Sequence, residues 1–206
     1  MRNNLPAVLD EYGCGEIKVV FDIGAHTGEW ARYARRLLPN ASIFCVEANP
    51  QLKQPPGEPP RGGWANAVLS APEITEVAFY ATGGTGDSYL KELTPHYDNV
   101  RPLLLPATTL DDLAIKKKWP PPQLLKLDTQ GSELDILRGS TKTLKSVKIL
   151  VAEVPVTPYN QGAPSFDAYV TFMCNLGFTV AGLEEEHFVS DPYPRLVQLD
   201  LVFRRP

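Results

Sequence analysis

Residues 19–30, VVFDIGAHTGEW, decide the fold of this chain. An apolar run of the length of a buried strand ends near Asp22, two glycines bracket a short turn, and a helical pattern begins at Glu29. A glycine-rich turn between a parallel strand and a helix lets backbone N–H groups approach a ligand closely. The stretch therefore predicts a strand, a ligand-binding turn and a helix.

A second apolar run, residues 42–47, ends in Glu47 about twenty residues after the glycine turn. An acid at the tip of the second strand of such a unit is well placed to hold the hydroxyls of a ribose. Together, the glycine turn and Glu47 predict a site for a cofactor that contains adenosine.

The spacing of the glycines bears on which cofactor this is. A dinucleotide fingerprint reads G-x-G-x-x-G, whereas this chain has Gly24 and Gly28 with Ala25-His26 where the middle glycine would stand. The pattern better suits S-adenosylmethionine, which has no phosphate. Asp22 can attract the ammonium of its methionine end, and the turn amides can receive the carboxylate.

Strands alternate with helices along the rest of the chain, which predicts an α/β sandwich with a mostly parallel sheet. No helix is expected between the last two strands, which indicates an antiparallel hairpin at one edge. The proline-rich segment 51–63 predicts a loop where such a fold normally has a helix. Further strands are expected near 64–69, 75–81, 124–128, 148–153, 178–183 and 197–203, and helices from 109, over 133–138 and over 165–176.

Four acids stand at the ends of predicted parallel strands, namely Asp22, Glu47, Asp128 and Glu153. The carboxyl ends of parallel strands share one edge of a sheet, and ligands bind there. Asp128, on a central strand, is the best candidate for the reaction centre.

A hydroxyl acceptor must lose its proton, and Asp128 can take it. His96 is a second candidate base if its loop folds over the site. Otherwise we expect His96 at the surface, as we do His187, which follows an acidic stretch. Asp128 and Glu153 can alternatively share Mg²⁺.

Composition excludes several classes of function. The length of 206 residues suits one domain over 1–206, with 1–17 as an N-terminal extension. The net charge of −4 argues against broad, non-specific binding of nucleic acid, which needs a basic face. The three cysteines form neither a zinc spacing nor a disulfide framework. There is no bilayer-spanning apolar run and no apolar signal core at the N-terminus, so we expect a cytoplasmic protein.

Six segments together carry a resemblance to a known family, namely 22–28, 46–50, 66–70, 109–113, 125–139 and 152–154. They resemble the FkbM family of methyltransferases, and the resemblance covers residues 19–203. It implies a Rossmann-like class I methyltransferase fold, with a mostly parallel seven-stranded sheet and an antiparallel edge hairpin. It also implies S-adenosylmethionine as methyl donor and a hydroxyl acceptor on a small molecule or sugar.

The resemblance, with the motifs, assigns a cofactor site in which Asp22 and Gly24 hold the methionine end and Glu47 the ribose. The full cofactor set is Asp22, Gly24, His26, Gly28, Glu47, Ala48, Asn66, Ala67 and Asp128. The acceptor set is Ser88, Gln130, Glu133, Glu153 and Tyr159. Glu133 can equally cap its own helix. The chain departs from the family at His26, where Asn is usual, and in its proline-rich segment.

Two alternatives to O-methylation remain open. One is N-methylation, although residues 128–130 lack the Asn/Asp-Pro-Pro-aromatic motif that binds a planar amino group. The other is a cofactor-binding partner subunit without catalysis. Neither nucleic acid nor a membrane is expected as a partner.

Overall fold

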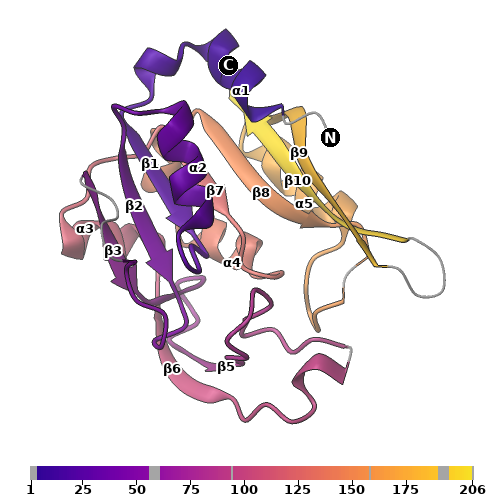
Figure 1. Cartoon of the computed structure of the whole chain (residues 1–206). Coiled ribbons are helices and arrows are strands. Elements are labelled where there is room, and N and C mark those ends of the chain that lie inside the picture. Colours follow the sequence, from indigo (N-terminus) through magenta and orange to yellow (C-terminus); the bar gives the residue numbers. More distant parts are fainter. Residues whose placement is uncertain (1–3, 56–60, 94, 158, 190–194, 206) are drawn as a thin grey trace.

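The computed structural model describes residues 4–55, 61–93, 95–157, 159–189 and 195–205. Its centre is a seven-stranded sheet with the order β3-β2-β1-β7-β8-β10-β9 (Figure 1). The strands are β1 (Val19–Ile23), β2 (Ser42–Glu47), β3 (Gly62–Asn66), β7 (Leu124–Leu127), β8 (Ile149–Pro155), β9 (Thr179–Val189) and β10 (Arg195–Arg204). The predicted α/β architecture is confirmed.

The strands β3, β2, β1, β7 and β8 pair in parallel, and β10 pairs antiparallel with both β8 and β9. All residues of β1, β7 and β8 are buried, because helices cover both faces of the central strands. The predicted edge hairpin is therefore β9–β10, with β9 at the open edge of the sheet.

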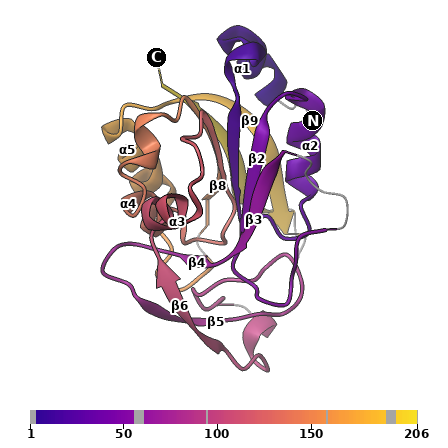
Figure 2. The ribbon, with the colours of Figure 1, turned by 90° about the vertical axis from the view of Figure 1, so that its left-hand side faces the viewer.

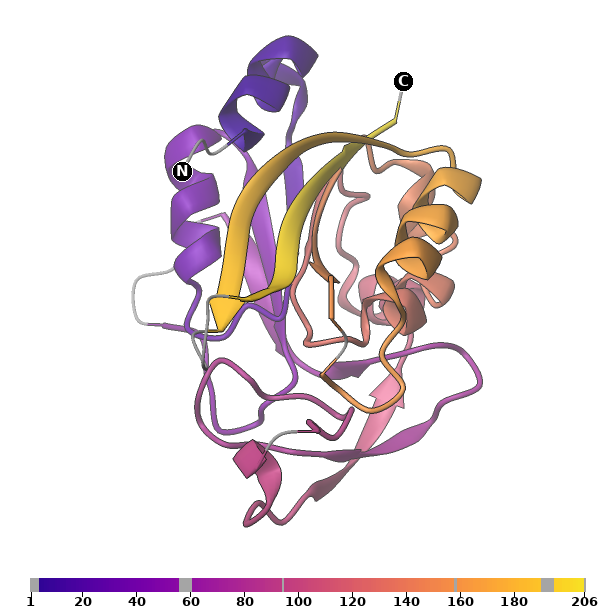
Figure 3. The ribbon, with the colours of Figure 1, turned by 90° about the vertical axis from the view of Figure 1, so that its right-hand side faces the viewer.

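Two groups of helices cover the two faces of the sheet (Figures 2 and 3). One core holds buried residues of α1 and α2, and the other holds buried residues of α3, α4 and α5. The helices are α1 (Leu5–Tyr12), α2 (Glu29–Leu37), α3 (Leu110–Lys117), α4 (Glu133–Arg138) and α5 (Phe166–Asn175), with 3-10 turns η1 (Cys14–Glu16), η2 (Pro95–Tyr97) and η3 (Thr143–Lys145). Within the described ranges, no helix combines the length and apolar character needed to cross a bilayer.

A second, three-stranded sheet lies beyond the carboxyl ends of the central strands (Figure 2). It consists of β4 (Val68–Leu69), β6 (Leu103–Thr108) and β5 (Glu76–Phe79). The prediction of one strand over 64–69 was wrong, because the chain leaves the main sheet after Asn66 and Val68 pairs with β6 instead. Strand β6 was not predicted, because it contains Pro106 and is defined by its pairing with distant segments.

The predicted helix starts differ in their capping. Thr109 caps α3 as expected, since its Oγ1 accepts a 3.0 Å hydrogen bond from the Asp112 N–H. Ser165 stands at the cap position of α5, but its hydroxyl donates to Asp167 instead of accepting from the backbone. The described part of the proline-rich segment 51–63, residues 51–55 and 61–63, contains no helix, and residues 56–60 lie outside the described ranges. The predicted loop ends earlier than expected, because β3 begins at Gly62.

Candidate cofactor and acceptor site

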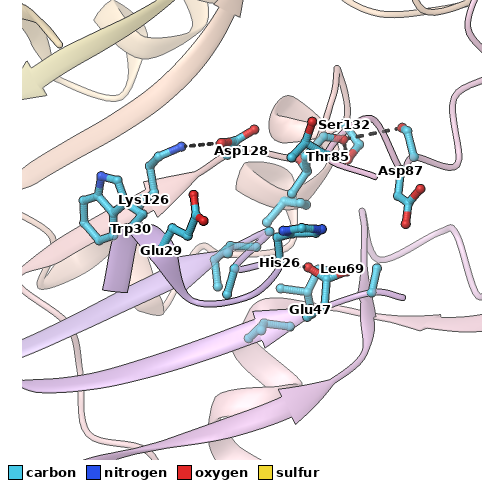
Figure 4. Close-up of a pocket in the computed structure, with 18 of the residues that line it drawn as sticks. His26, Glu29, Trp30, Glu47, Leu69, Thr85, Asp87, Lys126, Asp128 and Ser132 are labelled. Atoms are coloured by element: carbon cyan, nitrogen blue, oxygen red, sulfur yellow. Dashed lines mark hydrogen bonds and ion pairs between the residues drawn. The ribbon is translucent and has the colours of Figure 1, made fainter. Parts of the chain in front are cut away.

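A cavity of about 430 Å³ opens at the carboxyl ends of β1, β2 and β7. Its wall combines the turn after β1, the end of β2, the second sheet and the hairpin β9–β10. Figure 4 shows Glu47 and Asp87 toward one end and Trp30 and Lys126 toward the other. The volume is in the range of small-molecule and cofactor sites.

The glycine turn is shaped by contacts that only glycine permits. Gly24 has a φ of 80°, and a Cβ there would overlap the backbone carbonyl of Asp128. The N–H groups of Gly24 and Ala25 both donate to the carbonyl oxygen of Val46, at 2.9 and 3.0 Å. Gly28, with a φ of 77°, then caps α2. The turn is therefore locked against β2 on one side and β7 on the other.

His26 lies at the tip of this turn and lines the cavity. Its φ of 46° is left-handed, a conformation in which Asn, Asp and His are enriched among non-glycine residues. A histidine at this position is therefore compatible with the left-handed turn. The His26 N–H donates to Glu47 Oε2 at 2.7 Å, so the turn and the second strand tip are joined directly.

Glu47 is held by the backbone at both carboxylate oxygens. Oε2 accepts from His26, and Oε1 accepts from the Asn49 N–H at 2.7 Å. The residue is 6% exposed and lines the cavity. Burial raises the pKa of Glu47, while the two N–H donors oppose that rise. The carboxylate is thus fixed at the cavity wall.

Asp22 lies behind the turn and is 1% exposed. Its pKa is raised to about 7, chiefly by burial, with the charges of Asp128 and Glu47 adding to the rise and Lys126 opposing it. Its Oδ2 has no hydrogen-bond partner within the described part of the chain. The carboxyl group is therefore enclosed by the fold, and Asp22 lies outside the set of described residues that line the cavity.

Apolar side chains line the cavity beyond Glu47, at the end covered by the second sheet. They are Ala48, Ala67, Val68, Leu69 and Phe79. Asp87 lies at this end, and its carboxylate accepts from the N–H and hydroxyl of Thr82 and from the Asn49 side chain. The sequence indicates the loop 83–89 as a wall of the pocket but does not single out Asp87, because only the fold brings this loop to Asn49, beside Glu47.

Asn66 contributes to this end indirectly. Its side-chain amide donates to the backbone carbonyls of Glu47, Asn49 and Leu52, and it secures the loop after β2. It lies outside the set of described residues that line the cavity.

Lys126 and Asp128 form an ion pair at the end of β7. The Lys126 Nζ lies 2.8 Å from Asp128 Oδ2, and the lysine side chain is 2% exposed whereas that of Asp128 is 39% exposed. Burial alone would lower the pKa of Lys126, but attraction to Asp128 and Asp200 raises it above its ordinary value. Burial likewise opposes ionisation of Asp128, yet Lys126 outweighs it and lowers the pKa of that carboxyl.

Residues 22–180 match the methyltransferase FkbM domain. The chain belongs to the FkbM methyltransferase family. It is similar to the 2-O-methyltransferase NoeI of Sinorhizobium fredii (strain NBRC 101917 / NGR234), with 26% identity over 152 residues, which cover 66% of this chain and 62% of that protein. The match thus spans less than two thirds of the relative's length.

Solved structures show the same fold. The precorrin-6y C5,15-methyltransferase of Geobacter metallireducens GS-15 has a TM-score of 0.52 at 16% identity, over 100% of this chain and 90% of that chain. The methyltransferase FkbM of Methylobacillus flagellatus KT has a TM-score of 0.52 at 14% identity, over 89% of this chain and 43% of that chain. The class I methyltransferase fold expected from the sequence is confirmed.

In this FkbM chain, three of the expected acceptor residues form a polar network outside the cavity lining. Gln130 donates from Nε2 to Glu153 Oε2 at 2.8 Å and to Asp128 Oδ1 at 3.4 Å, and Tyr159 donates to Gln130 Oε1 at 2.7 Å. An amide thus bridges Asp128 and Glu153, and an ammonium already neutralises Asp128. This donor set does not fit Mg²⁺ shared by the two carboxylates, which needs both to turn free oxygens to the ion.

The other two expected acceptor residues differ in position. Ser88 lines the cavity, and its hydroxyl donates to the Gln130 carbonyl at 3.1 Å. Glu133 is fully buried, and its Oε1 accepts from the N–H groups of Thr129 and Gly131. Through these contacts Glu133 organises the loop before α4, and it lies outside the set of described residues that line the cavity.

The cavity of this FkbM protein is also lined by His187 and Asp200, which were not predicted to lie there. His187 was expected at the surface, but it lines the cavity together with Asp200, and their Nε2 and Oδ1 atoms lie 3.3 Å apart. No local pattern relates residues 187 and 200, since only the pairing of β9 with β10 joins them. His96 belongs to η2, but its side chain lies outside the described residues.

Proposed function

We propose that this protein transfers the methyl group of S-adenosylmethionine to a hydroxyl of a small molecule or sugar. The observation that carries the proposal is the fixed carboxylate of Glu47, which lines the cavity beside the turn at Gly24 and His26. A carboxylate in this position, with unused lone pairs on both oxygens, can accept hydrogen bonds from both hydroxyls of a ribose.

The turn favours S-adenosylmethionine over a dinucleotide. A pyrophosphate requires close backbone approach at the middle glycine of its fingerprint, and this chain carries the side chain of His26 there. The amino-acid end of S-adenosylmethionine instead needs donors and acceptors at the turn and at the strand tips. Gly24 lines the cavity with its backbone, and the Asp128 carboxylate can accept a hydrogen bond from the ammonium of that end.

The cavity has an apolar part and a polar part, which match the two ends of such a ligand. The apolar wall around Ala67, Leu69 and Phe79 suits the adenine ring, with the Asp87 carboxylate available to its amino group. Glu47 takes the ribose, and the sulfonium then lies toward Asp128. Methyl transfer is an in-line displacement, so most of the catalytic effect comes from positioning the acceptor opposite the sulfur.

Oxygen is the proposed acceptor atom because the similar protein NoeI is named a 2-O-methyltransferase. The acceptor end of the cavity carries Lys126, Asp128, His187 and Asp200, a set able to hydrogen-bond a hydroxyl-bearing ligand and move a proton.

Calorimetric titration with S-adenosylhomocysteine and with NAD, in parallel, tests the cofactor. Binding of S-adenosylhomocysteine without NAD binding supports the proposal, and the opposite pattern rejects it. Labelled S-adenosylmethionine is then offered to a panel of mono- and oligosaccharides, phenols and amines. Transfer to amines alone would reject O-methylation, and cofactor binding without transfer to any member would favour a partner subunit.

A further inference from the structure

The hairpin β9–β10 brings a histidine and a carboxylate to the cavity. His187 Nε2 lies 3.3 Å from Asp200 Oδ1, and both residues line the cavity. The His187 side chain is 34% exposed and that of Asp200 is 9% exposed. The imidazole is therefore accessible to a ligand while its carboxylate partner is held inside the wall. Figure 3 shows how the hairpin reaches the edge of the sheet where β8 ends.

The hydrogen bond fixes the chemistry of the imidazole. An ionised carboxylate only accepts, so the bond to Asp200 places the proton of neutral His187 on Nε2. The lone pair is then on Nδ1, which can accept a proton. Asp200 also stabilises the imidazolium that results, and it orients the ring.

Asp200 has a defined place in the sheet. It pairs with Glu153 of β8 and Glu185 of β9, and its Oδ2 lies 4.0 Å from the buried ammonium of Lys126. The carboxylate thus stands between a fixed cation on one side and the imidazole of His187 on the other.

The neighbouring charges favour His187 over Asp128 as the group that takes a proton. Lys126 overcomes the effect of burial and lowers the pKa of Asp128, and a carboxylate held ionised by an ammonium is a weak base. The hydrogen bond to Asp200 raises the pKa of His187, burial opposes it, and the charges of Glu185 and Asp128 add to the rise. Lys126 and Glu153 also face the pair, from β7 and β8, and Glu29 of α2 lines the same cavity.

We propose that His187, oriented by Asp200, is the general base that deprotonates the acceptor hydroxyl. The inference rests on the proposed methyl transfer. Nδ1 of His187 takes the hydroxyl proton as the acceptor oxygen bonds to the methyl carbon. The carbon–sulfur bond breaks, and its electron pair stays on sulfur to give S-adenosylhomocysteine. The imidazolium then releases its proton to solvent.

Three variants test this role. His187→Gln removes the base, Asp200→Asn removes its orienting carboxylate, and Glu186→Gln is a matched control at an exposed neighbour on β9. We expect His187→Gln to lower kcat roughly 100-fold or more, the range of general-base catalysis, with an unchanged Kd for S-adenosylhomocysteine. The control keeps the wild-type kcat. A wild-type kcat in His187→Gln, or a Kd that weakens as much as kcat falls, overturns the proposal.

The pH dependence separates a base from a structural residue. Neutral His187 is the active form, so kcat rises with pH through its pKa, and Asp200→Asn moves this rise to lower pH. NMR titration of the imidazole in the S-adenosylhomocysteine complex should show the same downward shift of the His187 pKa. An identical His187 pKa in the wild type and in Asp200→Asn would overturn the proposal that Asp200 orients and charges His187 for this role. This titration needs no acceptor, whereas failure of wild-type cofactor binding would reject the proposed function itself.

Discussion

The ammonium of Lys126 donates a 2.8 Å hydrogen bond to Asp128 Oδ2 and is itself almost completely buried. The same carboxylate lines the cavity. Asp128 therefore has two tasks, since it neutralises a cation inside the sheet and presents charge to a ligand. A substitution there affects both the stability of the fold and the chemistry of the site.

Asp128→Asn keeps the size of the side chain but removes its charge. Breaking a buried pair costs about 3–5 kcal/mol, but Asp128 is 39% exposed and Asp200 still faces Lys126, so we expect a loss of about 1–3 kcal/mol in the free energy of unfolding. Turnover should fall more than affinity for S-adenosylhomocysteine, since the charge lies at the proposed reaction centre. Urea unfolding and steady-state kinetics measure the two effects. An unchanged free energy of unfolding would show that Asp200 alone can neutralise the buried Lys126.

Glu47→Ala should weaken binding of S-adenosylhomocysteine by about 1.5–3 kcal/mol, as expected for hydrogen bonds to a charged group. The structure adds a cost in stability, because the N–H groups of His26 and Asn49 lose their acceptor. Asp111→Ala is an informative control, since this carboxylate also accepts backbone bonds but lies on α3, outside the cavity lining. Titration calorimetry measures the affinities. Equal loss of affinity in both variants would contradict a specific ribose contact.

Gly24→Ala should disrupt the cofactor turn. The added Cβ would overlap the carbonyl of Asp128, and the φ of 80° is unfavourable for alanine. We expect a loss of about 2 kcal/mol or more in the free energy of unfolding, together with weaker cofactor binding. Gly15→Ala is the matched control, because nothing lies within 4 Å of its Cβ. The two variants should differ clearly in melting temperature. Similar melting temperatures would contradict the close approach of Gly24 to the carbonyl of Asp128.

Asp22 should make stability depend on pH. Burial raises its pKa from 3.8 to about 7, so the stability that its protonated form contributes is complete below about pH 4 and is lost as the pH rises through 7. Asp22→Asn stays neutral throughout. As the pH is raised from 5 to 8, the free energy of unfolding of the variant should increase by about 2–3 kcal/mol relative to that of the wild type. Urea unfolding at both pH values measures this difference, with exposed Asp98→Asn as control. A constant difference across the range would argue against the raised pKa.

Chelation should leave turnover unchanged. Gln130 bridges Asp128 and Glu153, and Lys126 neutralises Asp128, so these groups do not form a magnesium site. Methyl transfer with and without EDTA checks this directly. Loss of activity that magnesium restores would contradict this expectation and show that an ion takes part in turnover.

The sequence by itself determined the elements whose signals are local. The run 19–23, the glycine turn and Glu47 are close in the chain, and they fold as predicted because a buried parallel strand must be apolar and a tight turn needs glycine. The short helix from Glu133 to Arg138 and the cap at Thr109 follow from neighbouring residues in the same way.

Only the tertiary structure decided which distant residues share the cavity. The second sheet forms because β6 pairs with segments on both sides of it in the chain, a choice that no local pattern encodes. Asp22 carries a signal typical of a ligand-binding acid, yet packing places it behind the turn. His187 resembled a surface residue within an acidic stretch, and the register of β9 with β10 brought it to Asp200 at the cavity wall. Long-range strand pairing, which depends on the whole core, therefore decided the charge partners of the site.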